Sequence, residues 1–401
     1  MKKTSPKSPK RTATASRKAP VAAVNWFENT VERCVVYAES AKKLGRRIVG
    51  LMCSYTPREI ITASGAIPIC LCGGTENAVP RKTASLPTSL CPLVKATYTF
   101  CVDPSNILME LSDVIVAETT LDAKKDVYDL MGHQYPVYLL ELPHQSDHAE
   151  AFQHWVMELR KLKTVLEQRF HTTITRQRLR WALREMNRER ELIRTMRTLM
   201  KNKTPPMTGR ELINMQHLIA CMPGDWDRYE AAIRTLRKRT PHPSLAGRVR
   251  VLLIGAPLPR VTIRMIDIVE SRGGVVVCHE NCTDLRPLTN DIDASADDPI
   301  VVIAQQYFHR PCSGMTPTDP DPARIDALAR EYAADCVIDY VWTECKSCCT
   351  TGSTMKTLVE KDMGLPYLRI ETDFSIKDIA HVRDTMDAFL KGVSPRRAKR
   401  S

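Results

Sequence analysis

Short apolar runs rich in β-branched residues recur along the chain, and stretches with helical spacing of apolar residues separate them. Near-continuous apolar runs of this length are typical of strands in a parallel sheet that helices cover on both faces. The predicted strands fall into two series. The first comprises Arg47–Cys53, Ala66–Cys72, Asp113–Ala117 and Val137–Leu142, and the second comprises Val249–Gly255, Gly274–Cys278, Ile300–Ala304, Cys336–Trp342 and Tyr367–Glu371.

The region between the two series has a different character. Residues 147–240 carry no strand signal, and apolar residues such as Leu179, Leu183 and Met186 recur at helical spacing among many Arg and Glu residues. Leu and Met at that spacing are packing residues of an amphipathic helix. The pattern therefore predicts an inserted helical region that ends at the proline-rich linker Thr240–Pro243.

These patterns predict an α/β protein with two parallel-sheet domains separated by a helical domain. Helices are also expected over residues 24–46 and 57–63, around the first predicted strand. At 401 residues the chain is too long for one ordinary core. The expected division is a basic tail over 1–22, a first α/β domain over 23–146, a helical domain over 147–243, a second α/β domain over 244–392 and a basic C-terminal tail over 393–401.

The net charge of +12 does not indicate a nucleic-acid-binding domain. Residues 1–20 hold seven basic residues and no acid, and residues 395–401 hold four more basic residues. The body between these tails is therefore close to neutral and has no basic footprint for a nucleic-acid groove. The tails themselves are rich in Ser, Thr, Pro and Lys, which is typical of solvated disordered segments.

Several common classes of protein are excluded by the absence of their motifs. The chain has no P-loop, no His-Glu-x-x-His and no Gly-x-Ser-x-Gly, and Gly255-Ala256-Pro257 lacks the other glycines of a dinucleotide fingerprint. No apolar run approaches the length of a membrane helix, and the basic N-terminus lacks the apolar core of a secretory signal. We therefore expect a cytoplasmic protein without a membrane partner.

The chain contains 14 cysteines, and two groups of them stand out by their position. Cys91 opens one conspicuous run, and Cys345, Cys348 and Cys349 lie about 250 residues later, just after a predicted strand. Thiolates from distant segments that converge at a domain boundary can hold an iron–sulfur cluster. A single Cys-x-x-Cys also suits zinc or a redox disulfide, so a zinc site completed by His279 and Cys282 stays open. The other cysteines, such as Cys278 and Cys336, are interpreted as core residues.

Four blocks of the sequence stand out together: Gly50–Gly74, Leu86–Tyr98, Ser112–Leu130 and Val337–Ser375. They resemble the 2-hydroxyacyl-CoA dehydratase and benzoyl-CoA reductase superfamily. The run Cys91-Pro92-Leu93-Val94-Lys95, together with Glu118-Thr119-Thr120 and Glu141-Leu142-Pro143, is most similar to its double-cubane cluster branch.

The resemblance implies two flavodoxin-like domains and a helical domain, with subunits paired as homodimers or as heterodimers with a paralogous chain. It implies an iron–sulfur cluster held by three cysteines per subunit, as [4Fe–4S] or as a double-cubane [8Fe–9S] cluster. It also implies a separate ATP-hydrolysing iron–sulfur activator protein that delivers electrons one at a time, so ATP would act only through that partner. The expected function is thus a low-potential reductase, or a dehydratase subunit acting on a CoA thioester.

One position departs from the family pattern. Cys91 and Cys345 match two of the three ligand motifs, but Leu121 stands where the family has the third cysteine. Leucine has no atom that can bind iron. Three interpretations remain open: a nearby thiol substitutes, the cluster is held by fewer ligands and is labile, or the chain is a cluster-less partner of an active subunit. The candidate substitutes are Cys348, Cys349, Cys53 and Cys101.

Three further residues are candidates for catalysis. Lys95 could stabilise the charge of the substrate or the cluster, as could Arg58, Lys124 and Lys125, although surface pairing is an equally good interpretation of all four. Glu118 could act as a base or as a hydrogen-bond acceptor. Arg286 lies where the family has an arginine-containing loop, but Asp284 replaces the glycine of that loop.

Overall fold

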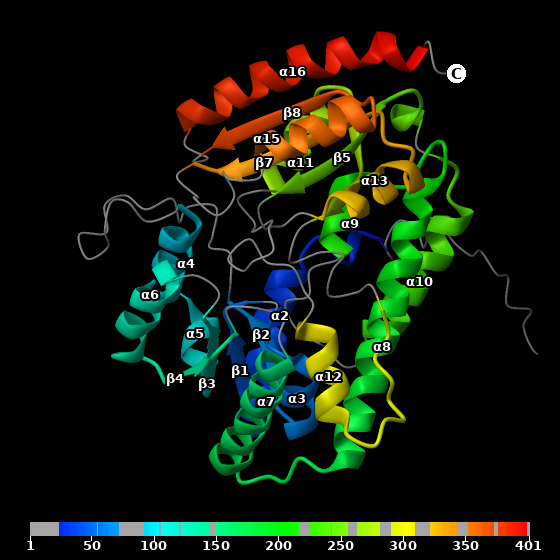
Figure 1. The fold of residues 1–401 in the computed structure, drawn as a ribbon. Coiled ribbons are helices and arrows are strands. Elements are labelled where there is room, and N and C mark those ends of the chain that lie inside the picture. The colour runs from blue at the N-terminus through cyan, green and yellow to red at the C-terminus, as the bar shows by residue number, and fades with distance from the viewer. Residues whose placement is uncertain are drawn as a thin grey trace, which may run out of the picture.

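The structure, a computed structural model, contains two parallel sheets surrounded by helices (Figure 1). It describes residues 24–53, 55–71, 92–103, 106–119, 122–143, 149–215, 225–241, 243–255, 263–280, 290–308, 321–343, 352–372 and 376–398. Each sheet has four strands in the same spatial order. The predicted α/β class with two parallel sheets is therefore confirmed.

The first sheet is formed by residues before 141. Its strands are β1 (Ile48–Leu51), β2 (Ile67–Cys70), β3 (Val114–Glu118) and β4 (Val137–Leu140). They pair in the order β2-β1-β3-β4, and every pairing is parallel. The order places β1 and β3 side by side at the centre, where the chain switches from one side of the sheet to the other.

The second sheet repeats this order with later residues. Its strands are β5 (Val249–Gly255), β6 (Gly274–Glu280), β7 (Cys336–Trp342) and β8 (Tyr367–Thr372). They pair in the order β6-β5-β7-β8, again all parallel. The switch between the two sides of this sheet lies between β5 and β7, so β7 is the topological counterpart of β3.

One predicted strand is wrong, because Ile300–Ala304 lies in helix α12 (Pro299–Phe308). Its buried residues Ile300, Ile303, Ala304, Tyr307 and Phe308 follow helical spacing. Asp298 accepts hydrogen bonds from the backbone of residues 300 and 301 at 3.0 and 3.4 Å, and a proline occupies the first helical position. Cap and proline together start a helix, and they outweigh the strand preference of the β-branched run.

Helices cover both faces of the first sheet. One face packs against α2 (Thr30–Lys43), α4 (Pro92–Val102), α5 (Ile107–Leu111) and α6 (Asp122–Gly132). The other face packs against α3 (Arg58–Ser64), α7 (Ala149–Phe170), α12 and the first half of α8 (Arg176–Thr198). Residues 290–308 thus belong to the core of the first sheet, although they come from the second half of the sequence.

The second sheet is covered in the same way. One face packs against α11 (Ile263–Ser271) and α16 (Ile376–Ala398). The other face packs against α9 (Gly209–Met215), α10 (Asp225–Lys238), α13 (Pro322–Glu331) and α15 (Gly352–Thr357). Short helical turns lie at Leu199–Lys201, Pro243–Leu245 and Leu358–Asp362.

Two features of the helices concern the predicted C-terminal tail and the predicted absence of a membrane helix. Helix α16 extends to Ala398, so part of the segment expected as a C-terminal tail is helical. No helix among the described residues has both the length and the apolar character to cross a bilayer.

Helix α8 connects the cores of the two sheets. Leu179 and Leu183 in its first half belong to the core of the first sheet, and Ile193 and Met196 in its second half belong to the core of the second. Figure 1 shows this helix running along one side of the molecule beside both sheets. The longest helix of the region predicted as a helical domain thus packs against the cores of both sheets.

Two buried arginines attach α8 to the two sheets. Arg190 lies on the helix itself, and Arg250 binds the backbone just beyond its C-terminal end. Arg190 on α8 pairs with Glu59 of α3, and both side chains are almost fully buried. Glu59 also accepts a 2.9 Å hydrogen bond from the Tyr307 hydroxyl. Burial raises the pKa of Glu59, but the charges of Arg190 and Arg58 and the hydrogen bonds of the carboxylate together lower that pKa below its usual value. Beyond the end of α8, Arg250 of β5 donates to the carbonyl of Met200 at 2.8 Å.

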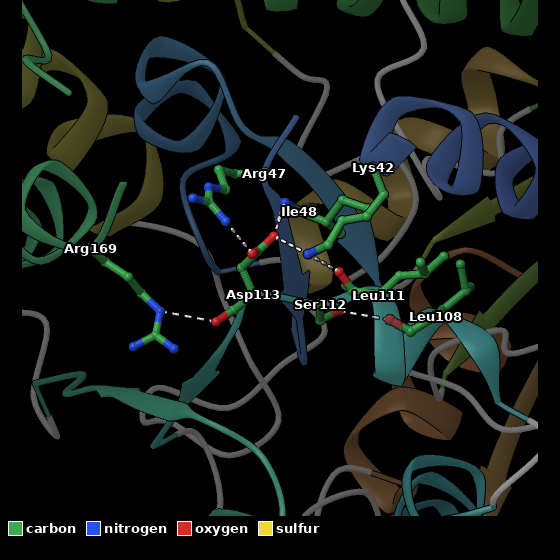
Figure 2. A network of polar contacts seen from close by, with 8 residues as sticks. All are labelled: Lys42, Arg47, Ile48, Leu108, Leu111, Ser112, Asp113 and Arg169. Atoms are coloured by element: carbon green, nitrogen blue, oxygen red, sulfur yellow. Dashed lines mark hydrogen bonds and ion pairs between the residues drawn. The ribbon is translucent and has the colours of Figure 1, made fainter. Parts of the chain in front are cut away.

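An ionic network fixes the amino end of β3. The Asp113 carboxylate accepts from Lys42 at 2.7 Å, from Arg47 at 3.1 Å and from the backbone of Ile48 at 2.8 Å, and its carbonyl accepts from Arg169 at 2.9 Å (Figure 2). Burial raises the pKa of Asp113, but the hydrogen bonds and charges of these cations lower it more. The network links α2, β1 and α7 to β3. It therefore holds the register of β3 in the first sheet.

The buried pair gives a stability prediction. Arg190→Met leaves the Glu59 carboxylate buried without its guanidinium, so we expect a loss of about 3–5 kcal/mol of stability. The measurement is the midpoint of urea unfolding, and the matched control is Arg188→Met on the same helix. Arg188 pairs with Glu230 at the surface, where water screens the pair, so that change should cost far less than Arg190→Met. Equal effects of the two substitutions would contradict the role of the buried pair.

Candidate functional site

The candidate site lies at the carboxyl ends of the central strands, where parallel α/β sheets bind their ligands. Those ends are Leu51 of β1 and Glu118 of β3 in the first sheet, and Gly255 of β5 and Trp342 of β7 in the second. Several predicted site residues lie outside the described residues, so only their flanking segments are described. They are Cys91, Arg286, Cys345, Cys348 and Cys349.

The counterpart strands β3 and β7 each end the same number of residues before a predicted ligand position. β3 ends at Glu118, three residues before Leu121, and β7 ends at Trp342, three residues before Cys345. β3 and β7 occupy the same place in their sheets, so positions 121 and 345 follow counterpart strands at the same distance in the sequence. The first half has a leucine where the second half has a thiol.

Glu118 is the best-described residue of the candidate site. Its side chain is completely buried, and Oε1 accepts a hydrogen bond from the Thr56 hydroxyl. Oε2 is also buried and has no hydrogen-bond partner among the described residues. Burial raises the pKa of Glu118 to about 8, although the charge of Lys124 and two backbone hydrogen bonds act in the opposite direction. The carboxyl group is therefore mostly protonated at neutral pH.

The neighbours of Glu118 hold this edge of the sheet together. The backbone of Thr119 donates to the Leu140 carbonyl at 3.2 Å, and the Thr119 hydroxyl accepts from the backbone of Leu142 at 3.0 Å. These bonds join the ends of β3 and β4. Lys124, in the first turns of α6, is close enough for its charge to lower the pKa of Glu118. Of the candidate cations, Lys124 thus lies near the buried carboxyl, while Lys95 is half-buried on α4.

Both flanks of the segment that contains Cys345 are anchored at the end of the second sheet. Before it, the backbone of Thr343 donates to the Thr372 carbonyl at 3.1 Å. After it, Gly352 packs so closely on Arg369 that a β-carbon at this glycine would lie 2.5 Å from Nη1. Arg369 in turn donates to Asp339 of β7 at 2.9 Å. Residue 343 is therefore tied to the end of β8, and residue 352 packs on an arginine from the middle of β8.

The Asp339 carboxylate is the centre of this anchor. It accepts from the Tyr367 hydroxyl at 2.6 Å as well as from Arg369. Burial raises the pKa of Asp339, although both hydrogen bonds and the charge of Arg369 oppose the rise. At the neighbouring end of β5, Gly255 has a φ of 121°, and a β-carbon there would lie 2.1 Å from the Tyr340 carbonyl oxygen. Only glycine allows β5 and β7 to approach this closely.

The alternative thiols and the zinc alternative are only partly described. Cys53 is half-buried just after β1, and Cys101 is fully buried in α4. His279 is buried at the end of β6 beside Glu280, which binds Arg324 at 2.8 and 3.3 Å, whereas Cys282 lies outside the described residues. None of the six cysteines that the structure describes forms a disulfide.

Arg58 has a different role in the structure from the one expected from the sequence, and several residues near the site were not identified from the sequence. Arg58, considered as a charge-stabilising group, is paired with Glu189 of α8 at 3.1 Å and is mostly buried. Thr56, Asp339 and Arg369 were not identified, because their roles arise from pairing between strands that are distant in sequence. The signal that could have found Thr56 is its place just after the first strand, at the same edge as Glu118.

Comparison with known proteins gives consistent matches over most of the chain. The model of the family "2-hydroxyglutaryl-CoA dehydratase, D-component" matches residues 53–391. The chain is 29% identical over 360 residues to the provisionally named dehydratase subunit YjiM of Escherichia coli (strain K12), covering 87% of this chain and 92% of that protein.

Two more distant relatives have named reactions. The (R)-phenyllactyl-CoA dehydratase beta subunit of Clostridium sporogenes is 22% identical over 377 residues, which cover 91% of this chain and 97% of that protein. One of the subunits of the benzoyl-CoA reductase of Thauera aromatica is 20% identical over 278 residues, which cover 67% of this chain and 69% of that protein.

The raised pKa of Glu118 gives a prediction about pH. Its pKa is about 8 in the folded protein and about 4.5 ordinarily, so the folded state binds a proton that the unfolded state releases between these values. Stability should therefore fall as the pH rises from about 5 to about 8. Glu118→Gln, which mimics the protonated form, should gain stability relative to the wild type over this range, by a few kcal/mol at most.

The measurement is the thermal unfolding midpoint of both proteins at a series of pH values. Glu191→Gln, at an exposed position on α8, is the control and should follow the wild type at every pH. A constant difference between Glu118→Gln and the wild type from pH 5 to pH 9 would show that Glu118 titrates normally.

Proposed function

Since the chain belongs to the 2-hydroxyglutaryl-CoA dehydratase D-component family, we propose that it is an iron–sulfur subunit of a low-potential reductase or dehydratase that acts on a CoA thioester. Its relatives are dehydratase and reductase subunits, which indicates an enzymatic role. The observation that carries the proposal is the equivalence of positions 121 and 345 at the ends of the two counterpart strands. In the sequence, Cys345 comes three residues after the end of β7, and the carboxyl ends of parallel strands are where α/β sheets bind their ligands.

The donor set of the chain fits an iron–sulfur cluster in part. Cys91, Cys345, Cys348 and Cys349 supply the soft thiolate ligands that such clusters require. Leu121 supplies none, so we propose that Cys348 or Cys349 provides the third ligand from the segment that already contains Cys345. When bound, the cluster would supply one-electron chemistry at low potential. The chain has no P-loop, so the energy for the electron transfer would come from a separate ATP-hydrolysing activator.

Glu118 is the group that we propose to handle the proton of the reaction. The departure of a hydroxyl group from a 2-hydroxyacyl thioester requires a proton, as does the reduction of an unsaturated substrate. A general acid works best with a pKa near the operating pH. Glu118 has a pKa of about 8, and its side chain is fully buried. The Thr56 hydroxyl fixes Oε1, which leaves Oε2 to carry the proton.

The cysteines give the test of this proposal. We expect the protein, purified without oxygen, to contain about four irons per chain, as for a [4Fe–4S] unit. Cys345→Ser and the double change Cys348→Ser with Cys349→Ser should each lower the iron and sulfide content. Cys336→Ala is the matched control, because Cys336 begins β7 at the edge opposite the site. Unchanged iron in the double variant would reject the substitute ligands.

A second candidate function follows from Leu121, which occupies the third ligand position. In this alternative the chain is a cluster-less partner of an active subunit, paired with it as a heterodimer. No iron in the wild-type protein after reconstitution would favour this alternative. Leu121→Cys distinguishes it further: if the missing thiol is the cause, the variant should gain iron that the wild type lacks.

A further inference from the structure

A group of three potential metal ligands lies at the end of the first sheet, on α7 and just after β4. Glu141 follows the last residue of β4 directly, and His154 and Glu158 are on α7. One ligand atom from each side chain lies within 4.8 Å of the other two. His154 and Glu158 are four residues apart, so they share one face of the helix. This group was not identified from the sequence, because strand and helix meet only in the fold.

The three side chains converge without binding one another. Among the described residues, no hydrogen bond or ion pair joins Glu141, His154 or Glu158 to another member of the group, and Glu158 has a single such partner, Lys161, at 2.6 Å. Two carboxylates at this separation repel each other, and Lys161 offsets part of this repulsion through its contact with Glu158. The Glu158 carboxylate is almost fully buried, with 3% of its side chain exposed, which makes a compensating positive charge more important.

A metal ion bound by all three side chains would account for the distances between their ligand atoms. Imidazole nitrogen and carboxylate oxygen bind zinc at about 2.0–2.2 Å, so two ligands of one tetrahedral ion lie about 3.4 Å apart. The observed upper limit of 4.8 Å requires only a small adjustment of side chains to reach this geometry. One imidazole and two carboxylates suit zinc and similar transition metals, whereas magnesium and calcium prefer oxygen ligands alone.

We infer that Glu141, His154 and Glu158 form a binding site for a divalent transition-metal ion such as Zn²⁺. Lys161 now provides the positive charge beside Glu158, but 59% of its side chain is exposed, so its ammonium group can turn to water when the ion binds. Three protein ligands leave a coordination position open to water. The ion would join the end of β4 to α7, and the inference does not depend on the cysteine ligands proposed above.

Cobalt binding to the full-length protein tests this inference, after purification without oxygen so that any iron–sulfur cluster is retained and after removal of other divalent ions. Co²⁺ replaces zinc and reports its ligands, because thiolate ligands add a sulfur-to-cobalt charge-transfer band that nitrogen and oxygen ligands do not produce. We expect one equivalent of Co²⁺ to bind with visible absorption bands but without this charge-transfer band. His154→Ala should weaken the affinity for that equivalent by at least about tenfold, and Lys161→Met should tighten it.

Two further variants test whether the loss of binding is specific to the proposed ligands. Glu141 is exposed, so Glu141→Gln removes a ligand without disturbing the core and should also weaken binding. His133→Ala, at an exposed histidine after α6, is the control and should leave binding unchanged. Binding by sulfur ligands alone would overturn the inference. Wild-type affinity in both His154→Ala and Glu141→Gln would also overturn it.

Discussion

The arrangement of the two sheets depends on a buried ion pair on one long helix. Arg190 and Glu59 are both almost fully buried, and their contact fixes α8 against the helix that follows β1. Just beyond the C-terminal end of α8, the side chain of Arg250 in β5 binds the backbone. An unpaired charge at Arg190 or Glu59 would be costly, so α8 cannot shift along the first sheet without a large loss of stability. The relative position of the two sheets follows from these two attachments.

This constraint matters because the proposed chemistry draws on both sheets. Glu118 is the last residue of β3, and the proposed ligand Cys345 comes three residues after the end of β7 in the sequence. Asp113 fixes the amino end of β3, and the Asp339–Arg369 contact joins β7 to β8. A one-residue slip of β3 would move Glu118 to the opposite face. The polar network at the far end of β3 therefore helps to determine where this carboxyl group lies.

The sequence was sufficient to predict most of the fold. Each of the eight strands that the structure describes corresponds to a predicted apolar run whose ends agree within two residues, because buried parallel strands need continuous apolar character. The error is Ile300–Ala304, which was predicted as a strand although its cap makes it a helix. The crossing of residues 290–308 to the first sheet could not be predicted, because nothing local encodes which core an amphipathic helix joins.

The candidate site was predictable only where residue type alone restricts the chemistry. Thiols such as Cys91 and Cys345, and an acid at the end of a strand such as Glu118, carry a signal in their identity and position. The Thr56 hydroxyl offers only its place after the first strand, and the Arg369 guanidinium offers no signal, because each acquires its role from a strand or segment that is remote in sequence. Burial, which gives Glu118 its raised pKa, is likewise a property of the packed structure.

The central claim is that sulfur ligands from both halves of the chain bind one iron centre. The most direct measurement is a crystal structure of the protein prepared without oxygen, with anomalous diffraction recorded at the iron absorption edge. Our account predicts iron peaks at bonding distance from the Sγ atoms of both Cys91 and Cys345. A structure in which these two atoms lie far apart, with no iron peak beside either, would contradict it.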